Sequence, residues 1–236
     1  MGLPTHFTNG VTNVGVGDPL YQFTMPDPTK WVIYHEDFHT FTTADWTITT
    51  TEAGAGDATE ALTDGSGGLL LITNDAADDD NDFFQKVGES FRWSSTKRMF
   101  FKTRFKVSDA TQSDVVVGLQ ITDTTPLDVT DGLFFLKADG SAAMSFRIEK
   151  DNTATALSSV ATLVNNTFVE LAFVYLPQAQ GGPVFDVYAD GVRVASTTTT
   201  TNAPDDEDLT ISFGIQNGEA VAKTMTMDYI FVALER

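Results

Sequence analysis

The amino-acid sequence predicts an all-β fold in which two antiparallel sheets pack face to face. Apolar and polar residues alternate along many short segments, as expected for strands that bury one face. Turn-forming residues separate these segments, and no segment has the periodicity of an amphipathic helix longer than about two turns. Without helices to cover a parallel sheet, short strands bury their apolar faces against a second sheet. We therefore expect a β-sandwich.

Residues 1–30 predict an extended arm that precedes the sandwich. They hold four of the eight prolines and only three charged residues, and proline removes the donors that a sheet needs. Large apolar side chains on the arm are candidate anchors for a groove on another protein: Leu3, Phe7, Leu20, Tyr21 and Phe23. Alternatively, the arm folds back along its own domain, because terminal segments often cover a sheet edge.

Residues 31–236 predict the sandwich itself. In the segment 98–107, alternate residues from Met99 to Val107 share one face, which is the pattern of a half-buried strand. Two Asp-Gly pairs, at residues 139–140 and 190–191, predict tight hairpins because these residues tolerate positive φ angles. Similar alternation predicts inward faces for Val115, Val117, Leu119 and Ile121; for Met144, Phe146 and Ile148; and for Val169, Leu171, Phe173 and Tyr175. Later strands are expected at Leu209, Ile211, Phe213 and Ile215, and at Met225, Met227, Tyr229 and Phe231.

Composition narrows the possible partners. The formal net charge is −19, with 33 acidic against 14 basic residues. Phosphate backbones and anionic lipids are held mainly by Lys and Arg, so we expect neither nucleic acid nor membrane as a partner. The chain contains no cysteine, which excludes disulfides and thiolate chemistry. It has neither a long apolar run nor a secretory signal, so we expect the protein in the cytoplasm unless it leaves inside a particle.

The sequence offers no catalytic motif, and we expect no enzyme and no cofactor. A retaining glycosidase on a sandwich needs two carboxylates about 5–5.5 Å apart. The nearest fragment is Glu149-Lys150-Asp151, which has no second glutamate downstream and predicts an exposed strand end. His35 and His39 are too far apart along a strand to share one zinc ion. The Gly-x-Ser-x-Gly motif is also missing.

Two charged segments are candidate binding sites. Asp78, Asp80 and Asp82 supply several oxygen ligands in a short segment, which suits calcium, although a solvated turn is the simpler explanation. Basic residues gather on one strand, at Arg98, Lys102, Arg104 and Lys106. In an acidic protein these predict a stripe that docks a neighbouring copy or another protein. The alternative is a strand whose solvent face happens to be basic.

Local motifs resemble a known sandwich family. The hairpin Tyr188-Ala189-Asp190-Gly191, followed by Val192 and Val194, is similar to a hairpin of laminin-G and concanavalin-A-like jelly rolls. The final strand, Met227–Val232, is similar as well. This resemblance implies a concanavalin-A-like jelly roll. It says little about function, because the fold hosts lectins, glycanases and structural modules.

A broader resemblance extends over most of the chain. It rests on the segments Phe7–Gly10, Met25–Lys30, Asp45–Leu62, Val107–Asp114 and Ser212–Gly218, which together look like those of a family of tailed-phage virion proteins. That resemblance implies a capsid decoration, or cement, protein on the virion surface. Its expected partners are the major capsid protein and further copies of itself, with a trimer as one arrangement.

Another reading keeps the fold and changes the function. A lectin-like module for host adhesion would bind carbohydrate on a concave face, with exposed aromatic residues such as Trp46 and Trp93 lining it. The acidic segment would then matter as a calcium site. An enzyme that cleaves a polysaccharide is a third reading, which the missing carboxylate motif disfavours.

Overall fold

The structure, a computed structural model, describes residues 28–53, 56–179 and 181–236. This part of the chain is almost entirely strand, and its one helix is the short 3-10 helix η2 (Thr43–Asp45). No helix in it is long and apolar enough to cross a membrane. The strands are β1 (Trp31–Glu36), β2 (Trp46–Thr51), β3 (Thr59–Thr63), β4 (Leu69–Thr73), β5 (Asn81–Lys86), β6 (Met99–Val107), β7 (Ser113–Gln120), β8 (Gly132–Lys137), β9 (Ala143–Lys150), β10 (Thr153–Thr162), β11 (Val169–Ala179), β12 (Gly182–Ala189), β13 (Val192–Thr197), β14 (Thr210–Asn217) and β15 (Thr224–Glu235).

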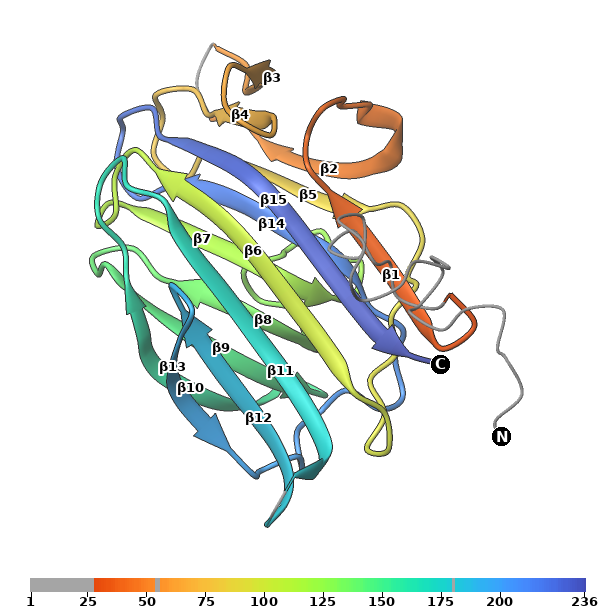
Figure 1. Ribbon diagram of the computed structural model, residues 1–236. Coiled ribbons are helices and arrows are strands. Elements are labelled where there is room, and N and C mark those ends of the chain that lie inside the picture. The colour runs from red at the N-terminus through yellow and green to blue at the C-terminus, as the bar shows by residue number, and fades with distance from the viewer. Residues whose placement is uncertain (1–27, 54–55, 180) are drawn as a thin grey trace.

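The strands form two antiparallel sheets, which we call sheet I and sheet II. Sheet I has the order β13-β12-β11-β6-β15-β4-β3, and β1 pairs with the other part of β15. Sheet II has the order β10-β9-β8-β7-β14-β5-β2. Figure 1 shows β15, β6 and β11 side by side in the front layer, with sheet II behind them. The predicted all-β sandwich is confirmed.

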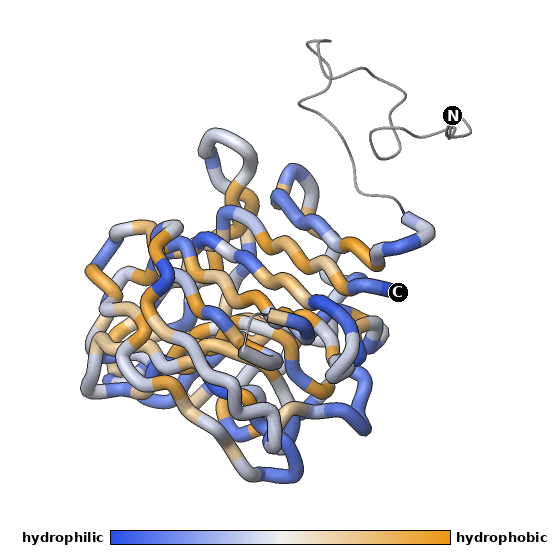
Figure 2. Tube along the Cα trace, turned by 60° about the horizontal axis from the view of Figure 1, so that its bottom comes forward, coloured by the Kyte–Doolittle hydropathy of each residue, from blue (hydrophilic) through white to orange (hydrophobic). Residues whose placement is uncertain are grey.

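The inward faces of both sheets fill one aromatic-rich core. On β6, buried and partly buried residues alternate from Met99 to Val107, as the sequence predicts. Phe146 of sheet II packs on Phe173 of sheet I with ring centroids 4.9 Å apart. Figure 2 shows the apolar segments on the strands and the hydrophilic ones mainly in the connections. The predicted inward residues of β7, β9 and β11 are buried, except that Ile121 lies just beyond β7 and is only partly buried.

One predicted face changes partway along its strand. Met225 and Met227 of β15 are buried, but the register with β6 shifts between Met227 and Tyr229. Asp228 is the extra residue, and such a bulge turns the following side chains to the opposite face. Tyr229 and Phe231 therefore lie outside the core, where Ile230 and the following alternate residues replace them.

Both predicted hairpins form. Asp190 and Gly191 connect β12 to β13 with φ angles of 48° and 75°. Gly140 lies between β8 and β9 with a φ of 76°, in the region that glycine adopts without strain. The anchors that the sequence predicts on the arm, Leu3, Phe7, Leu20, Tyr21 and Phe23, lie outside the described residues. Their role stays a prediction.

Candidate functional site

The outer face of sheet II is covered by residues 121–131, which we call the cover loop. Val129 of this loop packs with Phe83, Val116 and Phe134 of the strands in a second apolar cluster, separate from the main core. Glycines make room for two of these rings. A Cβ at Gly118 would lie 2.5 Å from Cα of Phe134, and one at Gly214 would lie 2.7 Å from Cα of Phe83. The strand positions paired with these two phenylalanines therefore need a residue without a side chain.

Buried glutamines on the strands fasten the cover loop. Gln85 Nε2 donates to the backbone oxygen of Ile121 at 2.9 Å, and its Oε1 accepts from the backbone N–H of Asp123 at 2.9 Å. Gln120 Nε2 donates to the backbone oxygen of Pro126 at 2.9 Å. Both glutamines are fully buried. Because an unpaired buried amide costs about 1–3 kcal/mol, these bonds fix the path of the loop.

A pocket of about 260 Å³ lies between the cover loop and the ends of β2, β5 and β14. We call it the loop pocket. Phe83 and Leu127 give it apolar surface, while amide, hydroxyl and carboxylate groups give it polar surface. Its lining residues are Thr51, Asn81, Phe83, Thr124, Thr125, Pro126, Leu127, Asp128 and Gln216.

One wall of the loop pocket is organised by Asp79. This residue has a φ of 65° in the turn before β5. Its backbone oxygen accepts from Asn81 Nδ2 at 3.2 Å, and its Oδ1 accepts from Gln216 Nε2 at 2.9 Å. Asn81 is only 8% exposed, and its Oδ1 has no hydrogen-bond partner. A buried acceptor of this kind can be satisfied by a water molecule or by a ligand that supplies a donor.

Glu149 lies elsewhere on the outer face of sheet II and is not the exposed strand end that the sequence predicts. It is 5% exposed, because β9 lies inside the sheet and its outer face is shielded. Arg147 Nη1 lies 3.5 Å from Glu149 Oε2. Burial raises the pKa of Glu149, against the opposing effect of Arg147. This carboxyl is thus engaged by a neighbour on its own strand.

The structure separates the calcium candidates Asp78, Asp80 and Asp82. Asp78 is exposed, while the Asp80 carboxylate accepts from the backbone N–H groups of Ala53 and Ala77. Asp82 belongs to β5, which begins at residue 81, and its side chain points into the sandwich. Within the described residues, no three His, Asp or Glu side chains are grouped to hold a metal ion.

Asp82 occupies an unusual environment between the sheets. It is fully buried, and its Oδ1 accepts from Thr50 Oγ1 at 2.9 Å. Burial raises the pKa of Asp82 to about 7, and the nearby carboxylates of Glu60 and Glu52 raise it further, against the hydrogen bond from Thr50. Asp82 is therefore a partly protonated group at neutral pH rather than a free calcium ligand.

The predicted basic stripe lies on the outer face of sheet I, on and beside β6. Each member is engaged within the chain. Arg98 pairs with Glu235, Lys102 Nζ lies 2.9 Å from Glu170, and Arg104 pairs with Asp228. Lys106 Nζ lies 5.0 Å from the ring centroid of Phe168. Intramolecular pairing thus neutralises much of the stripe.

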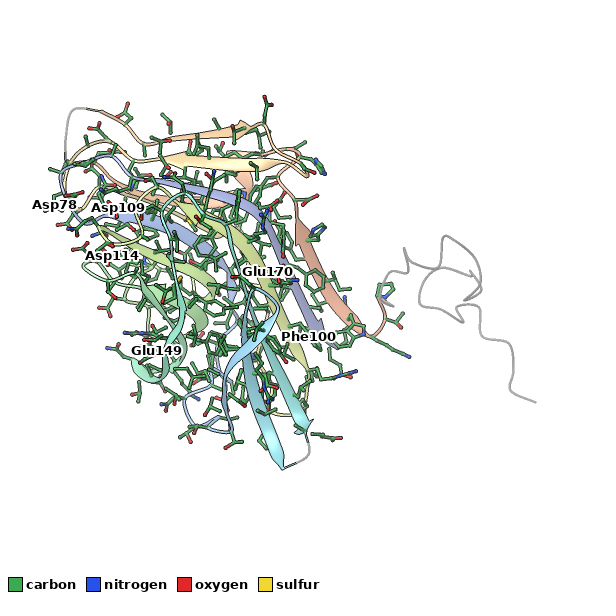
Figure 3. All side chains as sticks on the ribbon, turned by 60° about the vertical axis from the view of Figure 1, so that its left-hand side comes forward. Asp78, Phe100, Asp109, Asp114, Glu149 and Glu170 are labelled. Carbon is green, nitrogen blue, oxygen red and sulfur yellow. The ribbon has the colours of Figure 1, made fainter. Side chains whose placement is uncertain are left out.

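The same outer face carries an apolar row. Four apolar residues lie in register across β1, β15, β6 and β11. They are Ile33, Ala233, Phe100 and Val174. Ile33 is 36% exposed, and Phe100 packs against Trp31 with ring centroids 5.7 Å apart. Figure 3 labels Phe100 and Glu170 on this side of the sandwich and Glu149 on the other. We call these four residues the apolar row.

The aromatic residues expected to line a lectin site are buried. Trp46 is 6% exposed and Trp93 is 3% exposed. Trp46 packs edge-on against Phe213, and Trp93 packs against Tyr175, so their rings serve the core. Trp93 also borders a cavity of about 500 Å³ at one end of the sandwich. Half of the residues that line that cavity are charged, and its Arg92 Nε lies 3.2 Å from Asp208 Oδ1.

Solved structures with this architecture include a protein from Shewanella oneidensis MR-1 described as being of unknown function. It has a TM-score of 0.61 and 16% identity, and the match covers 95% of this chain and 97% of that one. An endo-1,3-β-glucanase from Streptomyces sioyaensis matches with a TM-score of 0.58 and 13% identity, over 89% and 99% of the two chains. The carbohydrate recognition domain of Emp46p matches with a TM-score of 0.55 and 12% identity, over 83% and 93%.

These identities show the fold alone, a concanavalin-A-like jelly roll shared by enzymes and by lectins. No curated protein matches the chain. The tailed-phage resemblance receives no support from the family model or from these structures. The model described as SO2946-like, C-terminal domain, matches residues 67–230, well over half of the chain. The protein therefore belongs to the SO2946-like family.

Proposed function

We propose that this protein is a carbohydrate-binding module that holds a sugar in the loop pocket. Small-molecule sites combine apolar walls with a few fixed polar groups. A sugar ring needs both, because it presents C–H groups on its faces and hydroxyls around its rim. The observation on which the proposal depends is Asn81, a residue that lines the pocket and whose buried Oδ1 has no hydrogen-bond partner among the described residues. A sugar hydroxyl would supply the missing donor.

The lining favours binding over hydrolysis. Glycosidases of the common type use two carboxyl groups that flank the scissile bond. Asp128 is the only acidic residue among those that line the loop pocket. The buried Glu149 does not line the loop pocket, and its carboxylate lies 3.5 Å from Arg147 Nη1. A single carboxylate cannot serve as both acid and nucleophile, so the pocket is suited to hold a glycan without cleaving it.

A matched pair of blocking variants tests this proposal on a glycan array. Thr124→Trp would fill the loop pocket, and Ser90→Trp would fill the larger cavity at the end of the sandwich. Both positions are exposed, so both variants should fold. We expect saturable glycan binding by the wild type and by Ser90→Trp, and its loss in Thr124→Trp. Binding that survives Thr124→Trp, or no binding by the wild type, would contradict the proposal.

The apolar row supports a second candidate function, a structural role in which sheet I docks on another protein. Apolar side chains in register across four strands form a flat strip beside ion pairs, as in the mixed surfaces of protein interfaces. This arrangement suits a decoration protein on a shell of capsid subunits. Next to the pairing of β1 with β15 in sheet I, Arg236 Nε donates to the Pro28 oxygen at 2.9 Å.

A charge placed in the apolar row tests the second function. Val174→Arg should leave the fold intact, because the side chain is only partly buried, but should weaken docking to phage heads that lack the protein. Lys97→Ala, at a partly exposed position outside the row, is the control. Equal binding by both variants would rule out docking through this face.

A further inference from the structure

The loop pocket offers hydrogen-bond acceptors more readily than donors. Asp79 accepts one hydrogen bond from the side-chain amide of Asn81 and one from that of Gln216. Both amides are thereby oriented with their N–H groups toward Asp79, and the Asn81 oxygen is left without a partner. The Thr125 hydroxyl is similarly committed, because it donates to Asp123 Oδ1 at 2.7 Å. A ligand that brings donors of its own would therefore pair with the acceptors that remain.

The charge around the loop pocket has one sign. Asp128 lies on its rim as an exposed carboxylate, and no Lys, Arg or His belongs to its lining. Asp79 adds a second carboxylate behind the amides. An anionic sugar would lose water and meet like charge without a compensating donor, which is unfavourable. A cationic amine would donate a charge-assisted hydrogen bond to Asp128.

From this geometry we infer that the loop pocket selects amino sugars, whose protonated amine donates to Asp128, and rejects uronic acids. The inference rests on the proposed carbohydrate-binding function and specifies its ligand class. The ring hydroxyls would donate to Asn81 Oδ1, while the ring face would contact Phe83 and Leu127. Neutral sugars would satisfy Asn81 but not Asp128, and so would bind with intermediate affinity.

Titration calorimetry with three matched tetrasaccharides tests this ligand class. The probes are a glucosamine tetramer, a glucose tetramer and a galacturonic acid tetramer, each measured against the full chain. We expect the glucosamine tetramer to bind about tenfold more tightly than the glucose tetramer, equivalent to about 1.4 kcal/mol, and the galacturonic acid tetramer not to bind. If no tetramer binds, the proposed function itself fails. If glucose or galacturonic acid oligomers bind as well as glucosamine oligomers, the function stands and the inference fails.

A charge-matched pair of variants separates the site from the general acidity of the protein. The net charge of −19 attracts any cationic oligomer, so binding alone is not sufficient evidence. Asp128→Asn should reduce the preference for glucosamine over glucose to about twofold or less. Asp64→Asn removes the same charge from an exposed turn between β3 and β4, and it should leave the preference unchanged. Equal effects of the two variants would overturn the inference.

Discussion

The two outer faces of the sandwich differ in what covers them. On sheet II the cover loop crosses the strands, buries Phe134 and leaves a pocket along its edge. On sheet I, Phe100 and Val174 remain partly exposed within the described part of the chain. A loop that crosses a sheet creates concave, partly dry sites for small ligands. A bare sheet offers a flat strip that suits another protein.

The stability lost on replacing one phenylalanine from each outer face tests this difference in coverage. Phe134→Ala should destabilise the protein by about 3–5 kcal/mol, because it leaves a cavity under the cover loop. Phe100→Ala should cost only about 0.5–1.5 kcal/mol, the contribution of its aromatic contact with Trp31. Urea unfolding of both variants gives the comparison. Equal losses would show that the two faces are covered to the same extent.

Gln85 tests whether the cover loop depends on its two hydrogen bonds. Gln85→Ala should destabilise the protein by about 1–3 kcal/mol, since it leaves the Ile121 oxygen and the Asp123 N–H without their partner. Gln178→Ala, at an exposed position near the end of β11, should change stability by less than about 0.5 kcal/mol. Thermal unfolding checks both values. A loss of glycan binding at temperatures where Gln85→Ala is folded would further tie the loop to the pocket.

The strands were predictable, whereas the cover loop was not. Alternation identified β6, β9 and β11 because each buries a single face. The segment 121–131 contains proline and several polar residues, so it predicts only a turn. A signal for it did exist. Val115 to Val117 and Leu133 to Leu136 are uninterrupted apolar runs, which indicate strands buried on both faces.

The candidate site was harder to predict because it depends on register. Asn81, Gln216 and Asp128 come from three distant parts of the chain, and nothing in their local sequence brings them together. The acidic segment near Asp80 predicts one loop, but its last residues belong to β5 and point in alternate directions. Only the pairing of β5 with β14 places Asn81 beside Gln216.

Two glutamates give opposite pH dependences on the two faces. Burial raises the pKa of Glu149, so its ionisation destabilises the fold as pH rises through that pKa. Burial also acts on Glu170, but hydrogen bonds from Tyr229 and Lys102 outweigh it and lower the pKa. Its contribution is present at neutral pH and is lost as pH falls through the lowered pKa.

Replacing each glutamate by glutamine tests these opposite pH dependences of stability. As pH rises from 4 to 7, the free energy of unfolding of Glu149→Gln should increase relative to that of the wild type. The free energy of unfolding of Glu170→Gln should decrease relative to that of the wild type. We expect both changes to be smaller than the roughly 1–3 kcal/mol of Gln85→Ala. Urea unfolding at several pH values measures them. If the two variants follow the same trend, the contrast between the faces is wrong.

The smallest effect concerns the ion pairs of sheet I. Lys102 and Glu170 are both partly exposed, so Lys102→Ala should cost only about 0.2–1 kcal/mol. High salt should remove most of that difference, because solvent-exposed pairs are screened. Lys106→Ala is the matched control, since Lys106 contacts the Phe168 ring rather than a carboxylate in sheet I. A Lys102 effect that resists salt would mean that this pair supports the fold. A salt-sensitive effect would leave the face free to exchange its internal partners for those of another protein.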